Sequence, residues 1–445
     1  MIGFETIGNA TLTVFDNEPV LTTDPWIIGK PYFGSWDHAY EIPQQQLENI
    51  KKSKYLWLSH GHPDHIDEQS LDLLSSSTFL IPDHYGDRIF NYFKTKFNCI
   101  KIKSNEWFQI SKNVRIKSFA DWNQDASLVV EILGKDIIVN QNDGALLGWS
   151  KTINSIVKNY KNKFILKLLN WGDADMINIY DENHNFIEPM AAKKMPIGEA
   201  YSRIMKNQGY NFAIPFSSMH QYVRKDSNNM NKYCTPLEMF NENFNNKYGE
   251  LLPAFIIWDS IYENYQKINP PKKTVKLIDP EFFGDSYSDS LLKEDKVLLK
   301  NYFNSFANLK KNFGEIVIIV AKEEYCINLS NKKPKIIFEA PRNSLIKSVK
   351  YEIFDDMLIG NFMKTTLVNC SSLYPNFTPY VAKYGDNGFS KTIKQLDGYF
   401  NFYKSNSADF WRDFLKIKTE NIVRTFIGNN SFFYNEARAI KQRFF

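Results

Sequence analysis

Residues 55–65 read YLWLSHGHPDH, and this stretch decides which fold we expect. It opens with a short run of aromatic and aliphatic residues, which is typical of a buried strand. His60, His62 and His65 then follow within six residues, although the whole chain has only seven histidines. Chemistry in α/β sheets commonly lies on the loops at the carboxyl ends of strands, because the strand holds the exposed loop rigidly. The pattern therefore predicts a metal site on the loop that leaves this strand.

The spacing within the histidine loop, residues 59–65, favours two metal ions over one. His60 and His62 lie one residue apart, so both imidazoles can point to the same side of the loop. Asp64 and His65 follow at a spacing that suits a second ion beside the first. Two divalent ions about 3.5–4 Å apart can share a water or hydroxide between them. We therefore predict a dinuclear site in which Asp64 is both a ligand and a catalytic residue.

The pattern around the histidine loop predicts an α/β fold. Period-two runs and short apolar runs indicate strands, and segments with helical periodicity separate them. A β-rich layer with helices outside it is typical of an αββα sandwich. The predicted strands are residues 11–15, 20–23, 55–58, 78–82, 114–119, 127–133, 136–140, 164–169 and 211–216, and the predicted helices are residues 44–52, 68–75, 88–97, 150–160 and 198–207.

The length of the chain, 445 residues, is too great for one ordinary core, so two or three packed units are expected. We place a catalytic sandwich domain in residues 1–234, a mostly helical extension in residues 235–313, and a C-terminal α+β domain in residues 314–445. The last of these vaguely resembles a sterol-carrier-like domain. A small α+β lid or a dimerisation unit is the alternative.

Composition argues against several classes of protein. Hydrophobic residues make up 43% and charged residues 23% of the chain, which is typical of a soluble globular protein. No apolar run is long enough to cross a bilayer and residues 1–5 do not begin a secretory signal, so we expect a cytoplasmic protein. The net charge of +4 is small and the lysine clusters have mixed neighbours, so no nucleic-acid partner is expected. The four cysteines form no CxxC pair, which argues against thiolate metal sites.

The HxHxDH pattern of the histidine loop resembles the metallo-β-lactamase superfamily, whose further ligands come from later loops. Asp143 follows the apolar run 137–139 and matches the carboxylate that bridges both ions, where it would also be catalytic. A turn aspartate without a metal is the alternative. His220 follows the run 214–216 and matches the last histidine ligand of the family. A surface histidine is the alternative.

The sequence departs from that superfamily at the third histidine ligand of the first ion. Residues 120–125 read ADWNQD where a histidine is expected, so Asp121 or Asp125 would substitute for it. An oxygen-rich site of this kind makes iron or manganese more plausible than zinc. His84 is a further candidate for the vacant ligand position, but we favour a structural or substrate-facing role for it.

Several segments resemble the catalytic part of the CMP-N-acetylneuraminate hydroxylase family, over roughly residues 5–225. The segments are TDPW at 23–26, LWLSHGHPDH at 56–65, DASLVVE at 125–131 and AIPFSS at 213–218, with a weaker echo in FDDMLIG at 354–360. Hydroxylases of that family carry a Rieske iron–sulfur domain, but this chain has no Cys-x-His…Cys-x-x-His arrangement. If the chain activates oxygen, its electrons must therefore come from a separate electron-donor protein or from the substrate.

These observations favour a dinuclear metal enzyme, with iron preferred and zinc or manganese as alternatives, that oxidises a polar anionic substrate linked to a sugar or nucleotide. The runner-up is a zinc hydrolase of a phosphodiester, lactone or amide that uses a metal-bridging hydroxide, and a non-catalytic binding protein is the third class. Arg224 is a candidate for orienting the anionic substrate. Asp173 in the segment WGDAD either touches the substrate or caps the following segment, and we favour the cap. In the leading hypothesis one ion is held by His60, His62 and either Asp121 or Asp125, the other by Asp64, His65 and His220, and Asp143 bridges them.

Overall fold

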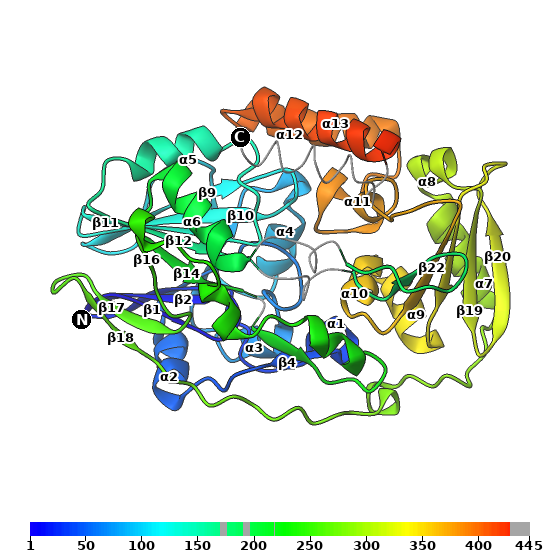
Figure 1. The fold of residues 1–445 in the computed structure, drawn as a ribbon, viewed down its shortest axis with the longest axis horizontal. Coiled ribbons are helices and arrows are strands. Elements are labelled where there is room, and N and C mark those ends of the chain that lie inside the picture. The colour runs from blue at the N-terminus through cyan, green and yellow to red at the C-terminus, as the bar shows by residue number, and fades with distance from the viewer. Residues whose placement is uncertain (170–175, 190–195, 218, 428–445) are drawn as a thin grey trace.

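The computed structural model describes residues 1–169, 176–189, 196–217 and 219–427. Two large sheets pack face to face in the N-terminal part of the chain, and helices cover their outer faces (Figure 1). The predicted αββα sandwich is therefore confirmed. The first sheet has the order β18 (Asn264–Lys267), β17 (Ile256–Asp259), β1 (Ile2–Ile7), β2 (Thr11–Asp16), β3 (Glu18–Thr23), β5 (Tyr55–Trp57), β6 (Thr78–Pro82) and β7 (Cys99–Ile102). The second has the order β16 (Glu250–Leu251), β14 (Phe212–Pro215), β12 (Asn162–Lys167), β11 (Asp136–Asn142), β10 (Ala126–Ile132), β9 (Val114–Ala120) and β8 (Phe108–Gln109).

The strands in the middle of the second sheet are buried on both faces. Because side chains alternate along a strand, Leu128 and Val130 of β10 point into the core between the sheets, whereas Val129 packs with the helix-side core. This two-sided burial explains why such strands read as continuous apolar runs in the sequence. The outer helices are α2 (Gln44–Lys52), α3 (Glu68–Asp72), α4 (Arg88–Phe93), α5 (Ser150–Val157) and α6 (Ile197–Gln208).

A smaller α+β unit follows the sandwich and has its own phenylalanine-rich core. Its five-stranded sheet takes β13 from the middle of the chain, so the two units interlock (Figure 1). The sheet order is β13 (Ile179–Tyr180), β22 (Lys364–Val368), β21 (Lys335–Glu339), β19 (Glu315–Val320) and β20 (Glu323–Asn328). The helices of this unit are α7 (Lys293–Asn304), α8 (Ala307–Asn312), α9 (Arg342–Lys350), α10 (Phe354–Ile359) and α11 (Thr378–Val381).

The helical segment between the two units is shorter than the predicted range 235–313. Strands β16, β17 and β18 lie in its first half and extend the two sheets of the sandwich. Ile256 and Trp258 of β17 alternate into the core between the sheets, and this short period-two pattern is easily missed in four residues. Helices α7 and α8 occupy the second half and pack in the core of the C-terminal unit. The sandwich thus continues beyond residue 234, to the end of β18.

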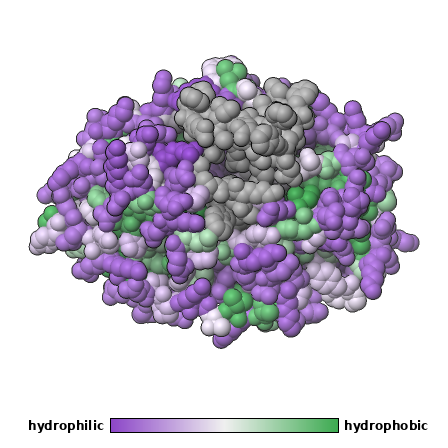
Figure 2. Space-filling model, viewed as in Figure 1, coloured by the Kyte–Doolittle hydropathy of each residue, from purple (hydrophilic) through white to green (hydrophobic). Residues whose placement is uncertain are grey.

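The last two helices lie across the top of the molecule (Figure 1). Helix α12 (Ile393–Asn406) places Tyr399 and Tyr403 in an aromatic cluster with Trp122, which belongs to the loop between β9 and β10. Helix α13 (Phe410–Ile427) adds Phe410 to the same cluster. Among the described residues, the helices are all too short or too polar to span a bilayer. Polar side chains cover most of the face in Figure 2, and apolar residues form small separate groups there.

Candidate metal centre

The histidine loop lies where strands of both sheets end. Strands β3 and β5 are parallel with Thr23 beside Trp57, so Asp24 and Ser59 emerge together from the first sheet. Strands β11, β12 and β14 of the second sheet are parallel to one another and end at the same edge. The loop after β11 therefore brings Asp143 to the histidine loop, where the Ser217 hydroxyl donates a hydrogen bond to it at 2.9 Å.

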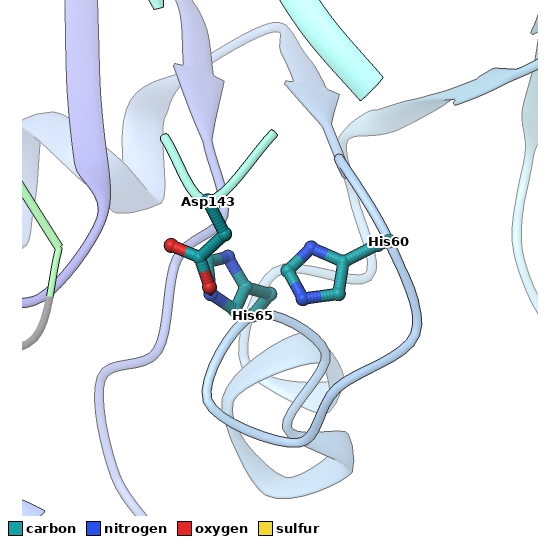
Figure 3. Close-up of side chains that lie close together, drawn as sticks. All are labelled: His60, His65 and Asp143. Carbon is teal, nitrogen blue, oxygen red and sulfur yellow. The ribbon is translucent and has the colours of Figure 1, made fainter. Parts of the chain in front are cut away.

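Three side chains, His60, His65 and Asp143, form what we call the inner group. They point toward one another, and each offers a ligand atom within 4.8 Å of the other two (Figure 3). Both histidines are buried, whereas Asp143 is partly exposed. Nε2 of His65 lies 3.3 Å from Asp64 and 3.5 Å from Asp143, yet it makes no hydrogen bond to any described residue. A cation between this nitrogen and these carboxylates would satisfy all of them.

Carboxylates behind the inner group orient its two imidazoles. Oδ2 of Asp24 lies 3.3 Å from Nδ1 of His65, and Oδ1 of Asp24 accepts a hydrogen bond of 2.7 Å from the Ser59 amide. Oδ1 of Asp125 lies 2.8 Å from Nδ1 of His60. A carboxylate on one ring nitrogen fixes the tautomer of a histidine and directs the other nitrogen at a metal. Asp24 and Asp125 are therefore placed to orient His65 and His60.

Asp64 is held on both of its oxygens. The Tyr32 hydroxyl donates to Oδ1 at 2.5 Å, and the Asn9 side chain donates to Oδ2 at 2.9 Å. Neighbouring His65 lowers the pKa of Asp64 far below its ordinary value, although burial acts in the opposite direction. Asp64 is thus an ionised carboxylate fixed at the floor of the site.

A second set of potential ligands, His62 with Asp355 and Asp356, joins the two units of the chain, and we call it the seam group. Each member offers a ligand atom within 4.8 Å of the others. Nε2 of His62 lies 3.3 Å from Oδ2 of Asp355, while Nδ1 of His62 lies 2.9 Å from Nε2 of His60. Our site prediction missed both aspartates, although they belong to the segment FDDMLIG that echoes the hydroxylase family. The similarity of this segment to the family does not reveal that its aspartates contact His62.

The seam group holds two carboxylates and one histidine, so its negative charge can exceed what His62 balances. Burial and the neighbouring Asp355 raise the pKa of Asp356 well above its ordinary value. Burial lowers the pKa of His62, but Asp355 and Asp356 outweigh it and raise the value to about 9. Buried carboxylates that repel one another in this way are stabilised by a bound cation. Imidazole and carboxylate are ligands for iron, manganese and zinc, so the residues present fit a metal ion.

Four predicted metal ligands belong to neither group: Asp64 and Asp125, described above, and Asp121 and His220. Asp121 is buried and accepts hydrogen bonds from the backbone amides of Asn123 and Leu147, which makes it a turn-stabilising residue behind Asp125. His220 is buried and stacks on Trp36 with ring centroids 3.4 Å apart. Within the described part of the chain, no group of three close ligand atoms includes Asp121 or His220. Their ligation therefore stays a prediction, and the geometry favours Asp125 over Asp121.

Of the three predicted substrate-binding residues, the structure describes His84 and Arg224, and both are buried. His84 is buried behind the histidine loop, where its Nε2 lies 3.0 Å from the Ser59 carbonyl oxygen. Arg224 is fully buried, and its guanidinium donates to Asp226 and Asp285 at 2.8–2.9 Å. A substrate anion would have to displace these carboxylates, so the geometry favours a structural role for Arg224. Asp173 lies outside the described residues.

A lysine that the sequence did not single out lies beside the inner group. Lys167 ends β12 and pairs with Asn142 in the parallel register, next to Asp143. Burial lowers the pKa of Lys167 to about 8, and nearby Asp143 and Asp125 oppose this effect. The side chain is partly exposed, so it is accessible to an anionic ligand. Lys167 therefore becomes a second candidate, in addition to Arg224, for orienting an anionic substrate.

The sequence is similar to curated hydroxylases over part of its length, and no family model matches it. It is 30% identical over 163 residues to the cytidine monophosphate-N-acetylneuraminic acid hydroxylase of Asterias rubens, which is 32% of this chain and 25% of that protein. It is 29% identical over 127 residues to the hydroxylase of Cricetulus griseus, which is 26% of this chain and 22% of that protein. The matched region thus spans about a quarter of the length of these relatives.

Solved structures with a similar arrangement include a possible metal-dependent hydrolase from Veillonella parvula, with a TM-score of 0.40 and 11% identity over 60% of this chain and 100% of that chain. A metallo-β-lactamase-fold protein from Bacillus subtilis gives a TM-score of 0.30 and 13% identity over 47% of this chain and 77% of that chain. The resemblance of this chain to the catalytic part of the CMP-N-acetylneuraminate hydroxylase family is confirmed as a similarity over about a third of its length.

Proposed function

We propose that this chain is a dinuclear metal-dependent oxidoreductase, with iron as the preferred metal, that acts on a polar anionic substrate. The observation that carries this proposal is the oxygen-rich donor set around the three histidines of the loop. Three carboxylates and three imidazoles supply the ligand atoms of the two groups, further carboxylates lie against the imidazoles, and hard oxygen ligands favour iron or manganese over zinc. The carboxylates concerned are Asp64, Asp125, Asp143, Asp355 and Asp356.

We assign the binding site of the first ion to the inner group. His60, His65 and Asp143 would hold it, and iron bound there would supply the capacity to activate dioxygen for oxidation. Asp24 and Asp125 keep the imidazoles oriented, which is worth about 10–100-fold in metal affinity for such partners. The burial of His60 and His65 leaves the side of Asp143 and His62 for the approach of a substrate.

The substrate class follows from charge and from the relatives. Lys167 is a partly exposed cation beside Asp143, so it can bind an acidic group of the substrate close to the inner group. The curated relatives are named as hydroxylases of a nucleotide-linked acidic sugar. A sugar that carries a carboxylate or a phosphate is the substrate class that we propose here. Because this chain has no Rieske motif, a separate electron-donor protein or another reductant would supply the electrons.

A hydrolase is the second candidate, because two bound ions could activate a bridging hydroxide and hydrolysis needs no electrons. The two proposals differ in metal and in co-reactant. Metal-free protein would be loaded with iron(II) without air, and dioxygen uptake measured with a reductant and with free or cytidine monophosphate-linked acidic sugars. Uptake that depends on the sugar supports the oxidoreductase. Turnover of a phosphodiester or lactone by the zinc form without dioxygen, and no uptake by the iron form, would replace it with the hydrolase.

A further inference from the structure

We propose that the second metal ion binds at the seam group, so that the C-terminal unit completes the active site. The ligands would be Nε2 of His62 and one carboxylate oxygen each of Asp355 and Asp356. This inference rests on the proposed function only in assuming that the inner group holds a first ion. It differs from the ligand set predicted from the sequence, which used Asp64, His65 and His220 for the second ion.

The geometry of the seam group is that of a small cation site. Its three ligand atoms lie within 4.8 Å of one another, and one imidazole stands against two carboxylates. The connection to the inner group runs through His62, whose Nδ1 is 2.9 Å from Nε2 of His60. Two neighbouring cations are thus compatible with the positions of these two rings.

An independent observation is an unsatisfied oxygen in the seam group. Asp355 is 2% exposed, and its Oδ1 accepts no hydrogen bond from the described residues. A buried carboxylate oxygen without a partner is costly, and a bound cation would satisfy it. Lys383 interacts electrostatically with both aspartates, but its ammonium donates its hydrogen bond to the backbone carbonyl of Tyr351 at 3.0 Å.

The sequence-predicted alternative for the second ion is less well supported by the contacts. Both oxygens of Asp64 already accept hydrogen bonds, from Tyr32 and Asn9. The His220 ring lies flat on Trp36, with an interplanar angle of 7°. Within the described part of the chain, His220 belongs to no group of three close ligand atoms, whereas the seam group is assembled as it stands.

Helix α10 is fixed to the sandwich at one end, and Tyr384, which follows α11, makes a second contact between the two units, so the aspartates of α10 are held in place before any ion binds. At its C-terminal end, Asn361 accepts a hydrogen bond of 2.6 Å from the Ile177 amide and donates one of 2.8 Å to the Tyr222 hydroxyl. At the second contact, the Tyr384 ring packs against Gly61 of the histidine loop. A Cβ atom at Gly61 would lie 2.3 Å from Cγ of Tyr384, so only glycine permits this approach.

The donor set predicts which cation the seam group prefers. One imidazole and two carboxylates make a harder site than the inner group, which has two imidazoles and one carboxylate. Manganese(II) and iron(II) suit such a site better than zinc does. Mn²⁺ is therefore the probe of choice, since it tests occupancy of both groups without any turnover.

The experiment measures how many Mn²⁺ ions the metal-free full-length chain binds, by calorimetric titration and by elemental analysis after desalting. We expect two ions per chain for the wild type and one for the double variant Asp355→Asn with Asp356→Asn. Glu352→Gln is the matched control, because this nearby carboxylate on the C-terminal unit pairs with Lys391 at 2.7 Å and lies outside the group. It should retain two ions.

His62→Gln tests the same group from the sandwich side and covers the case in which the double variant does not fold. It should also bind a single ion. Two ions in either folded variant would overturn the seam site, and so would a single ion in the wild type that both variants retain. Those results would leave the proposed oxidoreductase intact, with its metal at the inner group. A wild-type chain that binds neither Mn²⁺ nor Fe²⁺ would overturn the proposed function as well.

Discussion

The inner group and the seam group lie side by side, but the fold builds them in different ways. The inner group comes from loops after strands of one sandwich, and buried partners such as Asp24 orient its imidazoles. The seam group joins His62 to Asp355, which is 293 residues away in the sequence, and leaves one carboxylate oxygen without a partner. Sheet topology thus prepares the first set of ligands, whereas the packing of two units prepares the second. Four variants test how far this contrast holds.

The largest effect is expected for Asp143→Asn, which removes one of the three ligands of the inner group. Turnover of the metal-loaded enzyme should fall by about 10³-fold or more, because the ion contributes several kcal/mol to stabilising the transition state. Steady-state kinetics and elemental analysis measure the two consequences. Asp355→Asn is the comparison, since it should retain the inner ion. Loss of both ions in either variant would show that the two groups are not separate.

Glu5→Gln tests a buried carboxylate that lies outside the metal centre, so that its effect on stability can be compared with that of the carboxylates in the two groups. Burial raises the pKa of Glu5 from 4.5 to about 7, although Asn49 and Gln46 donate hydrogen bonds to it. The folded state therefore holds a proton that the unfolded chain releases, and stability falls as the pH rises from about 4.5 to about 7. This shift corresponds to about 3 kcal/mol.

Chemical denaturation at two pH values measures the effect of Glu5→Gln. The variant should be more stable than the wild type by up to about 3 kcal/mol at pH 8 and nearly equal to it at pH 4.5. Removing metal with a chelator should leave this difference unchanged, because Glu5 lies outside both groups. A difference that disappears with the metal would link Glu5 to the site and contradict this account.

Asp24→Asn probes the partner that distinguishes the inner group from the seam group. The amide retains the hydrogen bond from Ser59 but no longer offers a carboxylate to Nδ1 of His65. Metal affinity of the inner group should drop by about 10–100-fold. Competition with a chelator of known affinity measures this change. Unchanged affinity would mean that the orientation of His65 comes from the backbone alone.

Lys167→Met is expected to have the smallest effect, confined to substrate binding. Losing one charged hydrogen bond to an anionic substrate costs about 1.5 kcal/mol or more, which raises KM about 10-fold. Metal content should not change. Lys383→Met is the matched variant beside the seam group, and its KM should stay within about threefold of the wild type, because Lys383 donates to Tyr351. An equal rise in both variants would place the substrate between the two groups.

The inner group could largely be predicted from the sequence, and the reason is local. An apolar strand followed by HGHPDH defines both the support and the ligands, and Asp143 follows a strand in the same way. Asp355 and Asp356 could not be assigned in this manner, because two adjacent aspartates at the start of a helix are usually solvated or capping residues. Only the docking of α10 onto the histidine loop brings their carboxylates close to His62.

The fold shows the same division between local and distant information. Long apolar strands such as β10 and β11 were predicted within a residue or two, because both faces are buried. The short strands β17 and β18 and the pair of β4 (Trp36–His38) with β15 (His220–Tyr222) were missed. A strand of three or four residues carries too little periodicity to be recognised, and its partners lie far away along the chain.

The distance in sequence between His62 and Asp355 has a consequence for biosynthesis. The sandwich is complete once β18 has emerged from the ribosome at Lys267, whereas α10 begins only at Phe354. Domains tend to fold as they are synthesised, from the N-terminus onward. A nascent chain can therefore load the inner group while the rest is still being translated, but the seam group has to wait for the finished polypeptide. The direction of translation would thus impose an order on the insertion of the two ions.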